Sequence, residues 1–305
     1  MVRFLVRRIV RMMFVLVGVL TLLFMAERLA GDPAQFLLGG QAGSPATLAR
    51  FRHQLGLDQP LLQQYGELLL RVAHGDLGQS LVYQQSTRKL IFSRFPKTAE
   101  LAIAATLIGL LIGVPVGVFA AAHRGKVADA MSMLVVQVGQ AMPVFWLALL
   151  LVLLFSVRFR WLPVAGSASL SALLLPAASI GVSFAATVAR VTRSAMLDVL
   201  GQDYIRTARS KGLRPSAVYV RHALRNAAIP VLTIVSLQFG ALLGGAVIIE
   251  SIFLWPGVGT LVLQAINSHD YPLMEAGVFV FACCFVLLNF CVDVLYTAVD
   301  PRIRI

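Results

Sequence analysis

Residues 131–157 read MSMLVVQVGQAMPVFWLALLLVLLFSV and contain no ionisable side chain. A helix of about 20 apolar residues is long enough to cross the hydrocarbon core of a bilayer. No water is present at that depth to bond the backbone, so a helix, which bonds its backbone internally, is favoured. The stretch therefore predicts a transmembrane helix and places the chain among the integral membrane proteins.

The composition indicates the same class. Of the 305 residues, 58% are hydrophobic and 13% are charged, whereas a soluble domain carries about 25% charged residues. The net charge of +12 also suits nucleic-acid binding, but in a membrane protein a basic excess is first expected on cytoplasmic loops. We therefore expect contact with the lipid bilayer and no nucleic-acid partner.

The same length criterion gives six predicted spans, at residues 9–26, 99–122, 131–157, 170–189, 227–249 and 276–299. They predict an all-α integral membrane protein with one domain over residues 1–305. Its parts are a first helix within 1–29, a connection at 30–98, spans two to four within 99–189, a loop at 190–226, spans five and six within 227–299, and a tail at 300–305. The basic start of the first span also fits a cleaved signal peptide, but the cleavage pattern after it is poor, so we expect the helix to be retained.

The orientation follows from the distribution of Lys and Arg beside short loops. With the N-terminus in the cytoplasm, 16 of the 26 Lys and Arg residues lie on cytoplasmic segments, and among short loops only Arg158 and Arg160 oppose the assignment. Both termini are therefore predicted inside, and the connection at 30–98 outside. Within that connection, six apolar residues at helical spacing predict a short amphipathic helix: Leu61, Leu62, Tyr65, Leu68, Leu69 and Val72.

Signatures of enzymes and cofactor sites are absent from the sequence. It contains neither G-x-S-x-G nor H-E-x-x-H, and its histidines and cysteines lack metal-ligand spacing. Its one Gly-Lys pair, Gly125 and Lys126, is followed by Val127 rather than Ser or Thr and lacks the upstream glycine of a phosphate-binding loop. We therefore expect no catalytic residue, no metal site and no nucleotide site in this chain. If the protein uses ATP, another subunit must bind it.

The predicted cytoplasmic loop includes residues 206–230, RTARSKGLRPSAVYVRHALRNAAIP, with five arginines and one lysine. Lys211 and Gly212 fit a helix end, and Pro215 fits the first turn of a second helix that enters the fifth span. The small residues Ala208 and Gly212 suit insertion of the first helix into a groove on a partner. A basic loop resting on anionic lipid headgroups is the alternative. Five residues recur on one face of the first helix: Leu197, Leu200, Gly201, Tyr204 and Ala208.

This loop resembles the E-A-A...G...L-P loop of importer-type ABC transporter permeases. By position, Thr207 stands at the Glu, Ala208 and Arg209 at the two alanines, Gly212 at the glycine and Pro230 at the proline. The chain departs from the motif at Thr207 and Arg209. In that family the loop forms a coupling helix that docks into a groove on the ATPase subunit. The resemblance therefore implies an ATPase-coupling loop that contains Tyr204, Thr207, Ala208, Arg209, Gly212 and Pro230.

Eight further stretches resemble the first permease of the dipeptide/oligopeptide branch of this family. They begin at residues 31, 54, 75, 221, 244, 269, 289 and 300, and they include QLGLDQPLLQQY, GDLGQSL and GGAVIIESIFLWPGVGTL. The resemblance covers nearly the whole chain. One departure is RFPKT at residues 94–98, where the branch has a Leu-Pro-x-Thr start to the second span. The branch also contains nickel, glutathione and opine importers.

The resemblance implies the type I (MetI-like) importer permease fold, with an extracytoplasmic loop between helices 1 and 2. It implies a translocating subunit of the bacterial inner membrane for di- or oligopeptides, with nickel, glutathione or opines as alternatives. The implied partners are a homologous second permease, two ATPase subunits that bind ATP and magnesium, and an extracytoplasmic substrate-binding protein. A membrane channel or scaffold that works without nucleotide is the alternative from another class.

Polar side chains in or beside the predicted spans are candidates for the translocation pathway or its gate, because they are costly in a membrane unless they face protein or water. Hydrogen bonding between helices is the commoner role for the amides. Glu250, Asp270 and Glu275 are expected at an acidic outer rim that faces the binding protein. Asp293 is expected to pair with a basic residue of the loop. The candidates are Gln137, Gln140, Gln238, Glu250, Asp270, Asn289 and Asp293.

Overall fold

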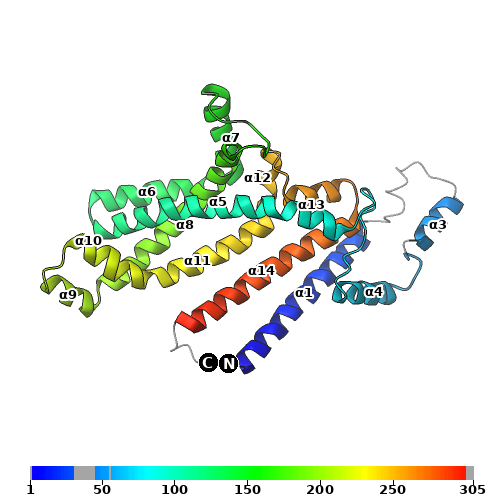
Figure 1. The fold of residues 1–305 in the computed structure, drawn as a ribbon, viewed down its shortest axis with the longest axis horizontal. Coiled ribbons are helices and arrows are strands. Elements are labelled where there is room, and N and C mark those ends of the chain that lie inside the picture. The colour runs from blue at the N-terminus through cyan, green and yellow to red at the C-terminus, as the bar shows by residue number, and fades with distance from the viewer. Residues whose placement is uncertain (1, 31–44, 55, 300–305) are drawn as a thin grey trace.

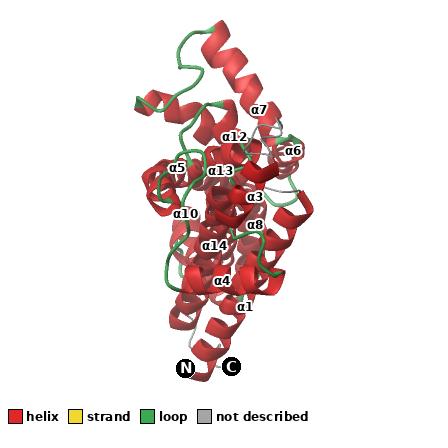
Figure 2. Ribbon diagram, turned by 90° about the vertical axis from the view of Figure 1, so that its right-hand side faces the viewer, coloured by secondary structure: helices red, strands yellow, loops and turns green. Residues whose placement is uncertain are grey.

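The described part of the chain is built from helices. The computed structural model describes residues 2–30, 45–54 and 56–299, and all its named elements are helices (Figure 1). Figure 2 shows these helices joined by loops. One isolated β-bridge, between Gln79 and Ser86, lies in the described loop between α4 and α5. The all-α prediction is confirmed. The motif at residues 31–40 and the tail at 300–305 lie outside the described residues.

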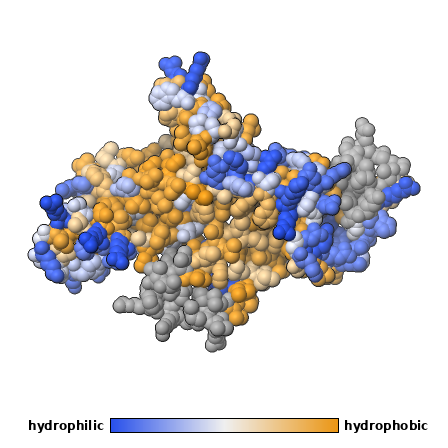
Figure 3. Space-filling view, in the orientation of Figure 1, coloured by the Kyte–Doolittle hydropathy of each residue, from blue (hydrophilic) through white to orange (hydrophobic). Residues whose placement is uncertain are grey.

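Within the described residues, five helical segments are long and apolar enough to cross a membrane, and they match the first, second, fourth, fifth and sixth predicted spans. They are Val6–Leu29, Thr87–Ala122, Leu170–Leu200, Pro215–Leu243 and Tyr271–Val292. The corresponding elements are α1 (Val2–Ala30), α5 (Thr87–Ala122), α8 (Leu170–Leu200), α10 (Pro215–Ala217) with a π-helical turn at Val218–Ala223 and α11 (Leu224–Gly245), and α14 (Tyr271–Val299). Figure 3 shows a broad hydrophobic surface between hydrophilic ends, as expected for a bundle that crosses a membrane.

The predicted third span is broken. It forms α6 (Val127–Ala141), α7 (Val144–Leu151) and a π-helical turn at Val152–Arg158, and its two halves meet at 97°. Met142 lies at the break with extended backbone angles, φ −74° and ψ 126°. A following proline favours these angles, and Pro143 has no N–H to continue the helix. The predicted six spans are therefore present only if the two halves count as one broken span. In Figure 1, α7 projects away from the bundle.

The centre of the bundle is the pair α5 and α8, which lie side by side along much of their length (Figure 1). Three glycines one turn apart on α5 face α8, namely Gly109, Gly113 and Gly117, and a β-carbon on any of them would overlap α8. Small residues at this spacing allow two membrane helices to approach closely. Gly109 meets Phe184 and Gly117 meets Thr192, so the contacts follow the same order along both helices and the helices run parallel.

The remaining helices surround this pair. α6 and α11 pack on α8, α14 packs on α11, and α1 packs on α14. The short helices α9 (Asp203–Ser210) and α10 lie at one end of the molecule (Figure 1). Toward the opposite end lie α3 (Pro45–Gln54), α4 (Leu61–Ala73) and α13 (Val258–Asn267). The helices of the loop at 190–226 and the helices α3 and α4 of the connection at 30–98 are thus at opposite ends, as the predicted topology requires.

The described part of the connection at 30–98 contains more helix than expected. α4 confirms the amphipathic helix predicted from the spacing of its leucines. α3 precedes it, and α5 begins at Thr87, well before the expected start of the second span at residue 99. The predicted span began after Lys97, the last basic residue before the apolar stretch. The helix itself begins earlier, because its first turns are polar and precede the apolar part.

Candidate functional site

The loop between α8 and α11 has the helix, glycine break and second helix that the sequence predicts. α9 (Asp203–Ser210) is followed by Gly212 at φ +75°, a left-handed conformation that glycine adopts without steric cost. Pro215 is the first residue of α10, where its missing N–H loses no hydrogen bond. The predicted helix from residue 197 is wrong at its start, because α8 continues to Leu200 and a break at residues 201–202 separates it from α9.

The inner face of α9 packs on its own chain. Ile205 is 0% exposed and Ala208 is 7% exposed, and both belong to an apolar cluster with Met196 and Val218. Ala208 was expected to insert into a partner. In the structure its methyl group packs on the core of this chain instead. The break before α9 also changes the helical register, so Tyr204 does not share the buried face and is 43% exposed.

The face of α9 that points away from the bundle is exposed and basic. Figure 3 shows hydrophilic surface at this end of the molecule. Tyr204 Oη accepts a hydrogen bond from Asn226 Nδ2 at 2.7 Å, which connects α9 to the beginning of α11. Pro230 is exposed farther along α11. The exposed side chains of α9 are Asp203, Tyr204, Arg206, Thr207, Arg209 and Ser210, and Arg206 Nη1 lies 3.7 Å from Asp203 Oδ1.

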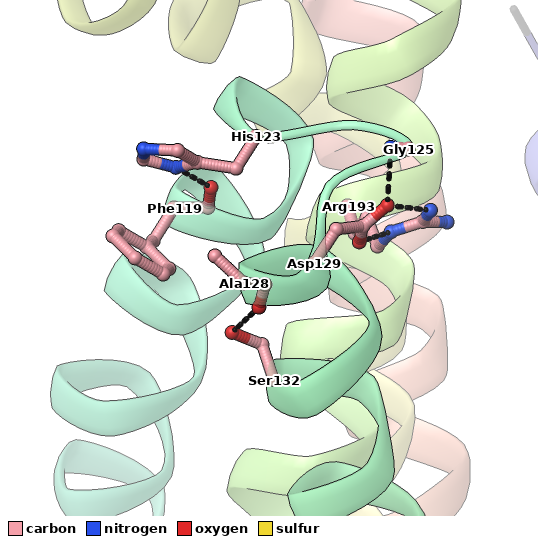
Figure 4. Close-up of polar contacts among 7 residues, drawn as sticks. All are labelled: Phe119, His123, Gly125, Ala128, Asp129, Ser132 and Arg193. Carbon is pink, nitrogen blue, oxygen red and sulfur yellow. Dashed lines mark hydrogen bonds and ion pairs between the residues drawn. The ribbon is translucent and has the colours of Figure 1, made fainter.

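A partly buried ion pair connects α6 to α8, the helix that leads into this loop (Figure 4). Asp129, in the first turn of α6, accepts hydrogen bonds from Nε and Nη2 of Arg193 on α8, both at 2.7 Å, and from the Gly125 N–H at 3.1 Å. The side chains of Arg193 and Asp129 are 28% and 7% exposed, and the two-point geometry makes such a pair strong. Sequence reasoning missed it. The available signal was an acidic residue at the edge of an uncharged span, which needs a partner when buried.

The amides expected in the pathway do not form one cluster. Gln137 and Gln140 are exposed on α6, and Gln238 is half-buried on α11. Asn289 donates from Nδ2 to the Phe285 carbonyl at 2.9 Å, within α14. The three glutamines therefore stay candidates for a pathway, whereas Asn289 is bonded within its own helix. The side chain of Asp293, also on α14, lies outside the described part of the structure.

Glu250 and Asp270 do not form the expected acidic rim, because both are 0% exposed. Asp270 accepts hydrogen bonds from the Ser80 hydroxyl and from the N–H groups of Leu81 and Val82, the latter two at 3.1 and 3.3 Å. Asp270, the residue before α14, is thereby joined to residues 80–82 of the connection at 30–98. A buried carboxylate with several donors is an anchor between segments, and the rim assignment is corrected accordingly.

Glu250, on α12 (Val247–Ile252), anchors the loop FLWPGVGT at residues 253–260. Its Oε1 accepts from the Thr98 hydroxyl at 2.7 Å, and its Oε2 accepts from the Thr260 N–H at 2.9 Å. Thr98 Oγ1 accepts in turn from the Val258 N–H at 2.8 Å. Burial raises the pKa of Glu250, and the hydrogen bonds from Thr98 and Thr260 oppose that rise. The RFPKT departure from the family pattern thus keeps the threonine on which this contact depends.

The glycines of the same loop are required by the position of the Glu250 carboxylate. A β-carbon at Gly257 would overlap this carboxylate, and one at Gly259 would lie 2.7 Å from its Oε2. We expect Gly257→Ala to displace the carboxylate and to lower the free energy of unfolding by about 1–3 kcal/mol, because buried hydrogen bonds are lost. Thermal unfolding of the purified chain in detergent measures this change.

The matched control is Gly66→Ala on α4, where a β-carbon has no neighbour within 4 Å. Because alanine favours a helix more than glycine does, this variant should unfold at the parent temperature or slightly above it. Equal melting temperatures for the two variants would contradict the anchoring role of Glu250.

Two family models match the chain. "Binding-protein-dependent transport system inner membrane component" matches residues 113–305, and the N-terminal part of a binding-protein-dependent transport system membrane component matches residues 1–102. Two curated relatives match nearly the whole chain. The di/tripeptide transport system permease protein of Pseudomonas aeruginosa is 41% identical and covers 100% of this chain with 99% of its own length. The glutathione transport system permease protein of Salmonella paratyphi A is 42% identical, with coverages of 95% and 94%.

Solved ABC transporter structures show the same fold. An inward-facing structure of the MetNI methionine ABC transporter matches 70% of this chain with 97% of its own, at a TM-score of 0.59 and 18% identity. A crystal structure of an amino acid ABC transporter matches 68% of this chain with 93% of its own, at a TM-score of 0.55 and 15% identity. The type I importer permease fold implied by the sequence is therefore confirmed.

These matches also decide between translocation and catalysis. The relatives are transport permeases, and in this family the ATPase activity belongs to separate subunits. The apolar helices and the family together make the chain a multi-pass membrane protein. The chain belongs to the binding-protein-dependent transport system inner membrane components, and it is a permease subunit of an ABC importer.

Proposed function

We propose that this permease forms half of a translocation pathway for short peptides and that a second, homologous permease forms the other half. The observation that carries the substrate class is the identity of 41% and 42%, over nearly the full length, to permeases named for di/tripeptides and for glutathione. Glutathione is itself a short peptide, so both names describe one chemical class. The exposed amides Gln137 and Gln140 on α6 suit the peptide groups of such a substrate.

The proposed orientation places α9 in the cytoplasm together with both termini, and places α3 and α4 on the side of an extracytoplasmic binding protein. The basic loop at 190–226 supports this orientation, because short cytoplasmic loops carry the excess of Lys and Arg. ATP and magnesium are bound by two ATPase subunits, and the exposed face of α9 docks onto them.

The packing of α9 supports a mechanical role. Ile205 and Ala208 fix its inner face to the cluster that contains Met196 of α8 and Val218, just before α11. A movement of the ATPase subunit against Thr207 and the neighbouring side chains is therefore passed to two membrane helices at once. The helix needs no chemistry of its own, because its contribution is a rigid contact with the partner.

Charge reversal on the docking face tests this proposal. We expect Arg209→Glu to lower ATP-dependent uptake of a labelled dipeptide into proteoliposomes at least about tenfold, because a reversed charge at a complementary interface is strongly unfavourable. The complete importer, with binding protein, is reconstituted for the assay. Lys126→Glu is the matched control, since Lys126 is also exposed and predicted to be cytoplasmic but lies outside α9; it should remain within about twofold of the parent.

The same vesicles test the substrate class. Unlabelled dipeptide and glutathione should compete with the labelled dipeptide, and nickel chloride should not. Competition by nickel alone would overturn the peptide assignment. Normal uptake by the Arg209→Glu importer would overturn the docking role of α9.

A further inference from the structure

α7 and the π-helical turn after it form an arm that leaves the bundle (Figure 1). The arm runs from Val144 to Arg158 and turns by 97° from α6. A helix that is apolar on all sides is covered by lipid or by protein rather than by water. The exposed apolar side chains of the arm include Phe145, Leu149, Leu153 and Leu154. What surrounds its far end therefore depends on the depth of the arm in the membrane.

The length of α6 sets this depth. α6 (Val127–Ala141) follows the exposed cations Arg124 and Lys126, which mark one edge of the hydrocarbon layer. Its 15 residues rise about 22 Å, whereas the layer is about 30 Å thick. The break at Met142 therefore lies about 8 Å below the opposite edge, and the 97° turn keeps the arm near that edge. The end of the arm is thus close to the membrane–water interface, on the side away from α9.

Two arginines and two aromatic rings occupy the end of the arm. Arg158 and Arg160 are exposed, and neither side chain has a hydrogen-bond or ion-pair partner among the described residues. The rings of Phe159 and Trp161 stack with their centroids 4.7 Å apart, and Trp161 is 69% exposed. Tryptophan rings gather at the membrane–water interface, and long basic side chains extend toward it from the apolar layer. The chemistry of this end therefore agrees with the depth that the length of α6 gives.

An acidic partner for these arginines is also missing from the neighbouring sequence. Residues 130–197 contain no Asp or Glu. Arg158 and Arg160 are, moreover, the two basic residues of short loops that oppose the predicted orientation. The turn that carries them is closed by the Trp161 N–H, which donates to the Phe155 carbonyl at 2.9 Å. An ordered turn with two unpaired cations fits an anion that the surroundings supply.

We propose that Arg158 and Arg160 bind the headgroup phosphate of an anionic phospholipid in the leaflet away from α9. The guanidinium groups donate hydrogen bonds to the phosphate oxygens, which their planar geometry suits. Trp161 lies beside the upper part of the acyl chains, and the leucines of the arm lie among the chains below. The depth of the arm favours lipid as the occupant, because phosphates lie at the edge that the arm reaches. The contact holds the end of the arm and the loop at 159–169 that leads back to α8.

Quenching of tryptophan fluorescence by brominated lipid tests the site. The full-length chain, with the subunits that co-purify with it, is placed in vesicles of equal parts phosphatidylglycerol, which is anionic, and phosphatidylcholine, which is zwitterionic. In parallel samples one of the two lipids carries bromine on acyl carbons near the headgroup. The difference between the parent and Trp161→Phe isolates the Trp161 signal. Brominated phosphatidylglycerol should quench this signal at least about threefold more than brominated phosphatidylcholine, because arginines near the surface attract anionic lipid. The preference should weaken in high salt.

Two double variants assign the preference to the end of the arm. In Arg158→Gln with Arg160→Gln, both lipids should quench Trp161 equally, because the ring stays in the membrane and the guanidinium groups are gone. Arg88→Gln with Lys89→Gln is the matched control. It removes the same charge from exposed residues at the beginning of α5, and it should keep the preference of the parent. An unchanged preference in the first variant would overturn the assignment to these two arginines.

Two results with the parent chain would also overturn the proposal. Equal quenching by the two lipids would mean that the arginines bind no anionic headgroup. Quenching by neither lipid would mean that a protein, such as the second permease, covers the end of the arm. These comparisons need no arginine variant, so they decide the question even if the first double variant fails to fold. Because the readout is contact with lipid, a failure here leaves the uptake assays on α9 unaffected.

Discussion

Gly117→Ala should destabilise the permease, although alanine favours a helix more than glycine does. A β-carbon at Gly117 would lie 2.5 Å from the Ala189 carbonyl oxygen and 2.6 Å from Thr192 Cβ. The first of these atoms belongs to the backbone of α8, so the clash is relieved only if the two helices separate. Overpacking of this kind costs about 1–3 kcal/mol, and thermal unfolding of the purified chain in detergent measures it.

Gly139→Ala is the matched control for this prediction. Gly139 lies on α6 and also faces α8, but a β-carbon there would be 4.0 Å from the Ala186 side chain, which is ordinary contact. Alanine is favoured over glycine in a helix by about 1 kcal/mol, and this gain applies to both variants. Gly139→Ala should therefore match or exceed the parent melting temperature. A Gly117→Ala chain as stable as Gly139→Ala would refute the close packing of α5 on α8.

Asp129→Asn should cost about 2–4 kcal/mol of unfolding free energy. The change leaves Arg193 without its bidentate partner among packed helices, and an uncompensated charge in such a place is strongly destabilising. The expected cost is below that of a fully buried pair, because the Arg193 side chain is 28% exposed. Denaturation of the purified chain followed by circular dichroism checks the result. Asp58→Asn is the control, because Asp58 and His53 form an exposed pair at 3.8 Å that contributes less than about 1 kcal/mol.

The double variant Asp129→Asn with Arg193→Gln separates charge from shape. It replaces the ion pair by two neutral amides and leaves no unpaired charge, so it should be more stable than Asp129→Asn alone. Additive losses in the double variant would mean that the two side chains do not act as a pair.

The predictions for Gly117 and Asp129 both concern contacts of α8, the helix that leads into the loop at 190–226. α8 is held to α5 by the glycine stripe, to α6 by Arg193, and to α9 by the cluster that contains Met196 and Ile205. In the proposed coupling, a movement of α9 reaches the bundle through α8. A variant that loosens Arg193 from Asp129 should therefore also reduce uptake per ATP hydrolysed, because α6 would no longer follow α8.

The glycine contacts on α5 show how much of the helix packing can be predicted from the sequence. Gly109, Gly113 and Gly117 repeat every four residues, and small residues at that spacing indicate a close helix contact in membranes. The sequence therefore contains the signal for the contact. The partner α8 lies about 70 residues along the chain, and the spacing on α5 does not identify it.

In the candidate site, the sequence predicted only the features that depend on the backbone preferences of single residues. Gly212 at φ +75° and Pro215 at the start of α10 follow from the intrinsic preferences of glycine and proline. The sequence did not predict that the Ala208 side chain packs on its own chain. The two-residue break before α9 changes which residues of this helix share a face. Glu250 and Asp270 were placed at a rim because carboxylates at helix ends usually face water. Their actual donors, Thr98 and Ser80, are far away in the sequence.

The sequence by itself determined the membrane class, the place of the loop between the fourth and fifth predicted spans, the glycine stop and the family. These features depend on composition and on residues within a turn or two of each other, where hydrophobic periodicity and backbone preference act directly. The tertiary structure decided the 97° break in the third span, the Asp129–Arg193 pair, and the burial of Glu250 and Asp270. Each of these depends on which distant helices meet, because a buried charge is tolerated only where another segment supplies its partner.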